Sequence, residues 1–107
     1  MRITWKKQNN TLKIRLIGEL DHHCAVELRT KLDAMLTDES IKRLEFDMTD
    51  VTFMDSSGIG VILGRYRILV ARNGSIGILK APRNVDRILR MSGVYTLCDT
   101  TEGGKAI

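Results

Sequence analysis

Two hydrophobic periodicities alternate along this chain, and their alternation is what most constrains its fold. Segments in which every second residue is apolar are followed by segments in which apolar residues recur every third or fourth position. This order of strands and helices favours an α/β domain, because each helix crosses over between neighbouring parallel strands. The 107 residues suffice for one domain of this kind, spanning 1–107, and not for two.

The first third of the sequence predicts a β-hairpin followed by a helix. Residues 1–8 alternate weakly and residues 11–20 strongly, and the Asn9-Asn10 pair between them favours a turn. Asp21 is the expected N-cap of a helix over residues 22–37. The apolar residues of this helix lie three or four positions apart on one core-facing stripe: Ala25, Leu28, Leu32, Met35 and Leu36.

In the middle of the chain, we expect a short strand over residues 43–48 and a second helix over residues 57–71. The second helix ends before Asn73-Gly74, because both residue types readily adopt the left-handed conformation that closes a helix. Its predicted core stripe consists of Ile59, Ile62 or Leu63, Tyr66, and Leu69 or Val70.

The last part of the chain predicts a strand over residues 75–80, a third helix that begins near Pro82, and a short strand over residues 94–98. Residues 101–107, TEGGKAI, are expected to be frayed. The predicted fold is therefore an α/β domain with a mixed sheet of four to five strands. The sheet begins with the hairpin, continues with parallel strands, and is packed with helices.

Composition argues against several classes of function. The formal charge is +4, from 17 basic and 13 acidic residues. The basic residues are spread along the chain with few aromatic neighbours, which is unfavourable for a nucleic-acid surface. No apolar segment approaches the roughly 20 residues that cross a bilayer. The N-terminus also lacks the apolar core of a signal peptide, so we expect a cytoplasmic protein.

Cys24 and Cys98 lack CxxC spacing and a surrounding cluster of metal ligands. Reduced thiols are therefore the expected state, and neither a metal nor another cofactor is predicted. His22 and His23 are adjacent in the first turn of their helix, where we expect partly exposed side chains rather than ligands.

The sequence DSSG at residues 55–58 stands between strand and helix, where a nucleophile, a phosphate-binding loop or a helix cap can lie. A hydrolase elbow requires glycine two positions before its serine, but Met54 and Asp55 occupy those positions. A P-loop requires a lysine after its glycines, and the nearest basic residue here is Arg65. The local pattern favours a cap, in which Asp55 or Ser56 accepts hydrogen bonds from the first N–H groups of the helix.

Glycines in the same helix indicate a surface for close approach. Gly58, Gly60 and Gly64 each cost roughly 1 kcal/mol relative to alanine inside a helix. Gly60 and Gly64 lie on one face, opposite the predicted core stripe, so another backbone can come near. We therefore expect a docking surface with Ser56 at its edge, where the helix N-terminus accommodates a phosphate.

Three segments together resemble a known family: LIGELDHH at 16–23, FMDSSGIGVILGRYR at 53–67 and MSGVYTL at 91–97. They are similar to segments of the bacterial anti-sigma factor antagonists of the STAS domain family. The similarity is greatest to the sporulation members that act on the anti-sigma F factor. It extends over essentially the whole chain, in order.

The resemblance implies a binding module and not an enzyme. In this family the unphosphorylated antagonist binds an anti-sigma factor that is also a serine kinase (SpoIIAB-like), with its ATP or ADP, and the sigma factor is released. The kinase then phosphorylates the first serine of DSSG, which inactivates the antagonist. A PP2C-type phosphatase (SpoIIE-like) restores the active form. Nucleic acid and membrane are not among the implied partners.

Carried onto this chain, the resemblance implies phosphorylation of Ser56. Asp21 would contact the partner, cap its helix, or do both. The other implied partner-binding residues are Asp55, Ser57, Gly58, Ile59 and Gly60. Alternatives remain open: a STAS regulator of a general stress sigma pathway, a small nucleotide-binding or hydrolytic enzyme using the Ser56 turn, and a nucleic-acid binder.

Overall fold

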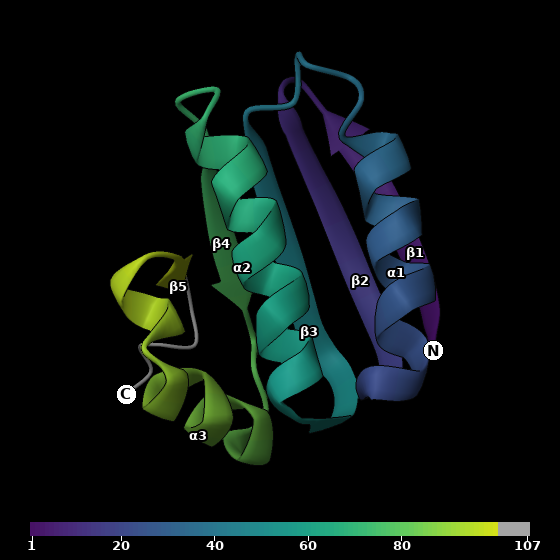
Figure 1. Ribbon diagram of the computed structural model, residues 1–107, viewed down its shortest axis with the longest axis vertical. Helices are drawn as coiled ribbons and strands as arrows, with labels where there is room; N and C mark the ends of the chain where they lie inside the picture. The colour runs from purple at the N-terminus through teal and green to yellow at the C-terminus, as the bar shows by residue number, and fades with distance from the viewer. Residues whose placement is uncertain (101–107) are drawn as a thin grey trace.

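Residues 1–100, the part of the chain that the computed structural model describes, form a mixed five-stranded sheet with helices packed against it (Figure 1). The strands lie in the order β1-β2-β3-β4-β5, with β1 antiparallel to β2 and every later neighbour parallel. The strands are β1 Arg2–Gln8, β2 Thr11–Leu20, β3 Arg43–Met54, β4 Ser75–Leu79 and β5 Asp99–Thr100. The helices are α1 His22–Met35, α2 Ser56–Val70 and α3 Arg83–Ser92, followed by a 3₁₀ turn, Val94–Thr96. The predicted α/β fold, with its initial hairpin and later parallel strands, is confirmed.

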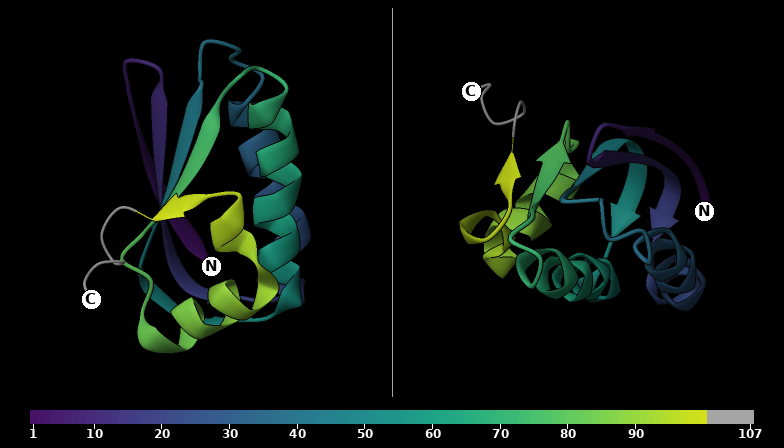
Figure 2. Two further views of the ribbon diagram at one scale, coloured as in Figure 1. Left: turned by 90° about the vertical axis from the view of Figure 1, so that its left-hand side faces the viewer. Right: turned by 90° about the horizontal axis from the view of Figure 1, so that it is seen from above.

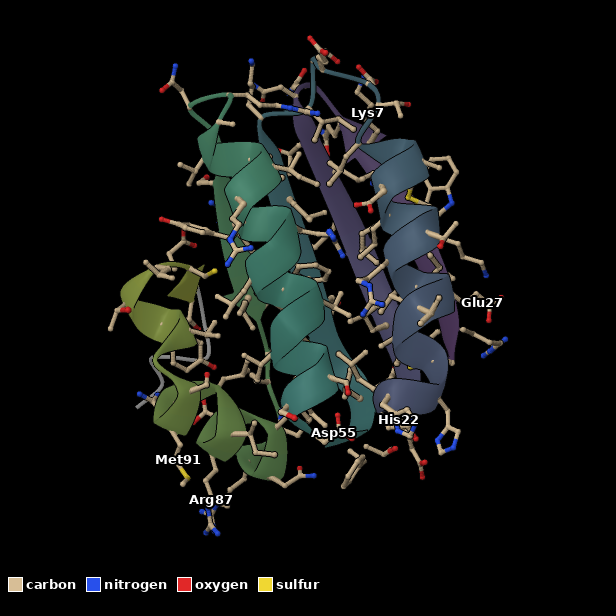
Figure 3. All side chains as sticks on the ribbon, in the orientation of Figure 1. Lys7, His22, Glu27, Asp55, Arg87 and Met91 are labelled. Atoms are coloured by element: carbon tan, nitrogen blue, oxygen red, sulfur yellow. The ribbon has the colours of Figure 1, made fainter. Side chains whose placement is uncertain are left out.

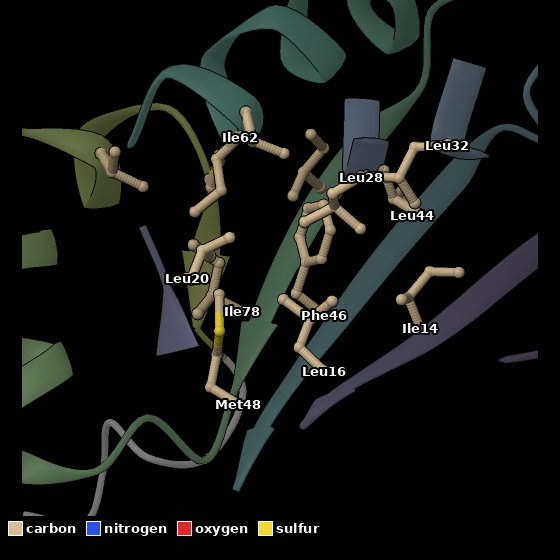
Figure 4. Close-up of a cluster of buried hydrophobic side chains, with 14 of the residues drawn as sticks. Ile14, Leu16, Leu20, Leu28, Leu32, Leu44, Phe46, Met48, Ile62 and Ile78 are labelled. Atoms are coloured by element: carbon tan, nitrogen blue, oxygen red, sulfur yellow. The ribbon is translucent and has the colours of Figure 1, made fainter. Parts of the chain in front are cut away.

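Helices α1 and α2 lie side by side over one face of the sheet, and α3 packs against β3 (Figure 2). The hydrophobic core fills the space between that face and the helices (Figure 4). Alternate residues of the central strands supply its sheet side, as their period of two requires: Leu12, Ile14, Leu16, Leu44, Phe46, Met48, Ile76 and Ile78. The predicted stripe of α1 also faces this core, with only Met35 partly exposed.

The predicted turns are present where asparagine supplies a left-handed residue. Asn9 between β1 and β2 has a φ of 57°, and Asn73 after α2 has a φ of 60°. Asparagine tolerates this region better than most residues do, because its short side chain can hydrogen-bond locally. The carbonyl of Asn10 then accepts hydrogen bonds from the N–H groups of Lys42 and Arg43, which fixes the start of β3 beside the hairpin.

Strand β3 is longer than the prediction of 43–48, because it continues to Met54. Asp50 is polar and stands where the alternation requires an apolar residue. The strand nevertheless stays paired with β2, across two irregularities in register, as far as Leu20 opposite Met54. The long partner strand therefore decides where β3 ends, and local sequence pattern does not.

The predicted strand over residues 94–98 is wrong. Gly93 has a φ of 83° and ends α3, and the chain then forms the 3₁₀ turn before the short strand β5 begins at Asp99. The N–H groups of Leu97 and Cys98 both donate to the carbonyl of Val94. Val94 and Cys98 are both buried, and their separation of four residues fits helical packing rather than a strand.

The core face of α2 includes Ile62 and Leu69 of the predicted stripe but differs from the prediction at its other positions. Val61 and Arg65 are buried, whereas Val70 is 46% exposed. Ile59, Leu63 and Tyr66 pack against the core only in part. Apolar residues fill several faces of this helix, so that period alone does not determine which face is inside.

The predicted fraying of residues 101–107 falls outside the described residues. Within residues 1–100, no helix is long and apolar enough to span a bilayer. The same residues contain no group of three or more His, Cys, Asp or Glu side chains that could hold a metal ion.

Candidate docking surface at the start of helix α2

Asp55 caps helix α2 at the point where β3 ends. Its backbone is extended, with a φ of −123°, and its Oδ1 accepts a hydrogen bond of 2.8 Å from the N–H of Ser57. The N–H of Gly58 donates to the backbone carbonyl of Asp55 at 3.0 Å. The predicted cap is therefore present, and of the two candidate residues Asp55 provides it.

Ser56 is the first residue of α2, and its side chain is exposed. Within residues 1–100 its hydroxyl makes no hydrogen bond, whether to His22, to His23 or to any other group. A group attached to its oxygen would meet the positive end of the helix dipole and solvent.

Asp21 caps α1 in the same way, one strand away. Its Oδ1 accepts hydrogen bonds from the N–H groups of His23 at 3.0 Å and Cys24 at 3.3 Å. Partial burial opposes ionisation, but these backbone donors outweigh it and lower the pKa of Asp21. Because β2 and β3 are parallel neighbours, Asp21 and Asp55 begin their helices at the same end of the sheet, where Figure 3 shows His22 and Asp55.

An apolar hollow opens beside Ser56, between the first turn of α2 and helix α3. Its volume is about 410 Å³, and its lining residues are Asp55, Ser56, Ile59, Ile88, Met91 and Ser92. Met91 is 80% exposed at the rim, and Figure 3 shows it at the same end of the molecule as Asp55. An exposed thioether next to a polar edge is typical of surfaces that bind other proteins.

The sequence pattern does not indicate the contribution of α3 to this hollow. It predicts a third helix after Pro82 but no role for Ile88, Met91 or Ser92 in a docking surface, although Met91 and Ser92 stand in the segment MSGVYTL. A signal is present nonetheless. Met91 stands three positions after Ile88, so the two side chains are neighbours on the surface of α3. Met91 lies outside the buried face of this helix, where a large apolar residue is unexpected.

Two of the predicted glycines differ in their surroundings. Gly60 is exposed, and a Cβ built on it would meet no atom within 4 Å, as a docking surface requires. Gly58 is buried, so that its predicted place on the surface needs correction. It allows the first turn of α2 to rest on the ends of β2 and β3. Ser57 and Ile59 are partly buried on either side of it.

Comparison with known proteins places these features in a family. The family model of the STAS domain matches residues 2–102. An anti-sigma F factor antagonist of Paenibacillus polymyxa is 33% identical over 97 residues, which cover 91% of this chain and 83% of the relative. An anti-sigma-B factor antagonist of Bacillus subtilis is 28% identical over 102 residues, with 92% of each chain covered.

Solved structures agree with the sequence relatives. The anti-sigma factor antagonist SpoIIAA in its unphosphorylated form is similar with a TM-score of 0.83 and 29% identity, over 98% of this chain and 92% of that one. The phosphorylated form of the Bacillus SpoIIAA is similar with a TM-score of 0.74 and 28% identity, over 98% and 96%. The chain described here therefore belongs to the STAS domain family, among its anti-sigma factor antagonists.

Proposed function

We propose that this chain is a protein switch controlled by phosphorylation of Ser56. In its unphosphorylated form it binds an anti-sigma factor that is also a serine kinase, and the bound sigma factor is released. Phosphorylation of Ser56 by that kinase, from ATP, ends the binding, and a PP2C-type phosphatase restores it. The protein acts in the cytoplasm as a binding module and performs no catalysis itself.

The position of Ser56 is the observation that carries this proposal. Its hydroxyl is exposed on the rim of the apolar hollow, and Asp55 provides the helix cap. Modification of Ser56 therefore breaks no hydrogen bond within residues 1–100 and leaves α2 capped. A helix N-terminus also stabilises an added phosphate, so the fold tolerates the modified state.

The same position explains how a phosphate would end binding. A phosphoserine carries about −1.5 to −2 charges at neutral pH. On the rim of the hollow it would lie beside the carboxylate of Asp55 and the apolar side chains of Ile59 and Met91. A partner that covers this surface would have to bury the new charge, which costs several kcal/mol when no counter-ion is present. Ser56 is thus the substrate of a regulator, in agreement with a solved relative in phosphorylated form.

The sporulation sigma-F pathway is the setting we propose. The Paenibacillus polymyxa relative is an anti-sigma F factor antagonist at 33% identity, whereas the Bacillus subtilis anti-sigma-B factor antagonist has 28%. A regulator of the general stress pathway is the second candidate, since its relatives cover the chain equally well. Phosphorylation of this chain after incubation with an anti-sigma F factor, compared with that after incubation with an anti-sigma-B factor, distinguishes the two pathways.

Intact mass spectrometry after incubation with an anti-sigma F factor and ATP tests the proposal. We expect the gain of one phosphate, mapped to Ser56 by fragmentation. The Ser57→Ala variant is the matched control and should still be phosphorylated, whereas Ser56→Ala should not. A phosphate that maps elsewhere, or a kinase that is active on another antagonist but does not modify this chain, would contradict the proposed switch.

A further inference from the structure

Arg65 is the one charged residue that is buried among residues 1–100. It extends from α2 toward α1 with a side chain only 8% exposed, and its Nε lies 3.1 Å from Oδ1 of Asp33. This contact is an ion pair without a hydrogen bond, because both Nε and Nη1 of Arg65 are fully buried and have no hydrogen-bond partner. Two enclosed donors of a cation thus lack an acceptor.

Neighbouring charges neutralise Arg65 only in part. Burial lowers its pKa, Asp33 raises it, and the nearby cation Arg29 lowers it again. Asp33 is itself 49% exposed, so water screens its attraction for the guanidinium. Two arginines therefore face one carboxylate where α1 meets α2. A buried cation in such surroundings is stabilised by a second, well-oriented carboxylate.

The outer surface next to Arg65 is unusually bare. A Cβ built on Gly60 or Gly64 would meet no atom within 4 Å. On α1, Val26 is 62% exposed. We call this surface the α1–α2 seam and define it by six residues: Val26, Arg29, Asp33, Gly60, Gly64 and Arg65. Glycines spaced four apart permit the backbone of another helix to approach, and Val26 offers it an apolar contact.

We propose that the α1–α2 seam extends the contact surface for the anti-sigma factor from Gly60 to Arg65 and receives a helix of that partner which carries a carboxylate. The excess positive charge of Arg29 and Arg65 favours an acidic segment of the partner. The absence of side chains at Gly60 and Gly64 favours a helix, whose backbone can approach closely. The seam is also continuous with the candidate docking surface, because Asp21 and Asp55 cap the same two helices. This inference rests on the proposed function, since it assigns a further contact to the same partner.

Binding of an anti-sigma F factor in the presence of ADP tests the seam, because Ser56 then remains unmodified. Arg65→Met removes the charge but keeps much of the volume, and Gly64→Leu fills the bare face. We expect each to weaken binding by about tenfold. Lys31→Met, on the side of α1 that faces β1, is the control and should change affinity by less than about twofold.

Asp33→Asn distinguishes a contact from a fold defect. Asp33 competes with the partner carboxylate for Arg65, so its removal should tighten binding by about threefold. A gain of affinity cannot come from misfolding, and thermal unfolding of every variant confirms that the fold is intact. If Arg65→Met and Gly64→Leu bind as tightly as the original chain, the seam is not a contact, although the proposed function stands. If the original chain neither binds nor becomes phosphorylated, both proposals are overturned.

Discussion

A side chain at Gly58 would begin 2.8 Å from Cγ of Met54, well inside the distance at which two carbon atoms pack. Its Cβ would also lie 2.9 Å from Cγ of Leu20. The first turn of α2 therefore rests directly on the last residues of β2 and β3. This close contact fixes the position of Asp55 and Ser56 relative to the ends of strands β2 and β3.

Alanine at positions 58 and 60 should have opposite effects on stability. Gly58→Ala should lower the free energy of unfolding by about 1–3 kcal/mol, because the new methyl group overpacks Met54 and Leu20. Gly60→Ala should raise it by about 0.5–1 kcal/mol, because alanine favours the helix and meets no atom within 4 Å. Urea unfolding of both variants measures the difference. Equal effects would mean that α2 does not rest on the strand ends as closely as described.

Asp55 and Ser56, the two polar residues at the start of α2, should also differ in how much each contributes to the stability of the fold. Asp55→Ala should cost about 1 kcal/mol of stability, because the N–H of Ser57 loses its acceptor. Ser56→Ala should change stability by less than about 0.5 kcal/mol, since its hydroxyl bonds to no described residue. Urea unfolding measures this pair as well. A large loss in Ser56→Ala would assign the serine a structural role and weaken its interpretation as a free phosphate acceptor.

Features set by a few neighbouring residues could be predicted from the sequence. The turn at Asn9, the caps Asp21 and Asp55, and the start of α3 after Pro82 depend on local backbone preferences. The sheet order follows from the alternation of elements, because consecutive parallel strands connected by helices usually lie side by side. The position of Ser56 at the start of α2 depends only on such local signals, which is why the sequence pattern predicts it.

Features that depend on distant partners could not be predicted. Strand β3 extends to Met54 because β2 is long enough to pair with it. Arg65 is buried because Asp33 of α1 lies beside it, and the sequence shows only a basic residue late in a helix. The hollow next to Ser56 forms because α3 brings Met91 near, through packing that no local pattern records.

The two cysteines should differ sharply toward an alkylating reagent. Cys24 is partly exposed at the start of α1, whereas Cys98 is 1% exposed and burial raises its pKa to about 11. We expect iodoacetamide at about pH 8 to modify one thiol of the folded protein and both in urea, because the thiolate is the reactive form. Intact mass counts the adducts, and Cys24→Ser should leave the folded protein unmodified. Rapid double modification without urea would show that the packing around Val94 and Cys98 opens readily.

The ion pair between Arg43 and Asp99 should make stability depend on pH below about pH 4. Arg43 donates to Asp99 at 2.8 and 3.0 Å and so connects β3 with the last strand. Hydrogen bonding to Arg43 lowers the pKa of Asp99. A second carboxylate, Asp38, behaves in the same way, because hydrogen bonds from Lys7 and Ser40 lower its pKa to about 2. Each folded-state pKa lies below its unfolded value, so the stabilisation is complete above the unfolded pKa and is lost as pH falls toward the folded one.

Removal of one carboxylate isolates the part of this pH dependence that belongs to Arg43. Asp99→Asn should cost about 0.5–1 kcal/mol at neutral pH, a modest amount because the side chain is 52% exposed and screened by water. Its stability should also fall less steeply than that of the original chain between about pH 4 and pH 2. In an Arg43→Met background the same substitution should have little effect at either pH, as urea midpoints will measure. An undiminished effect there would mean that Asp99 stabilises β5 through contacts other than Arg43.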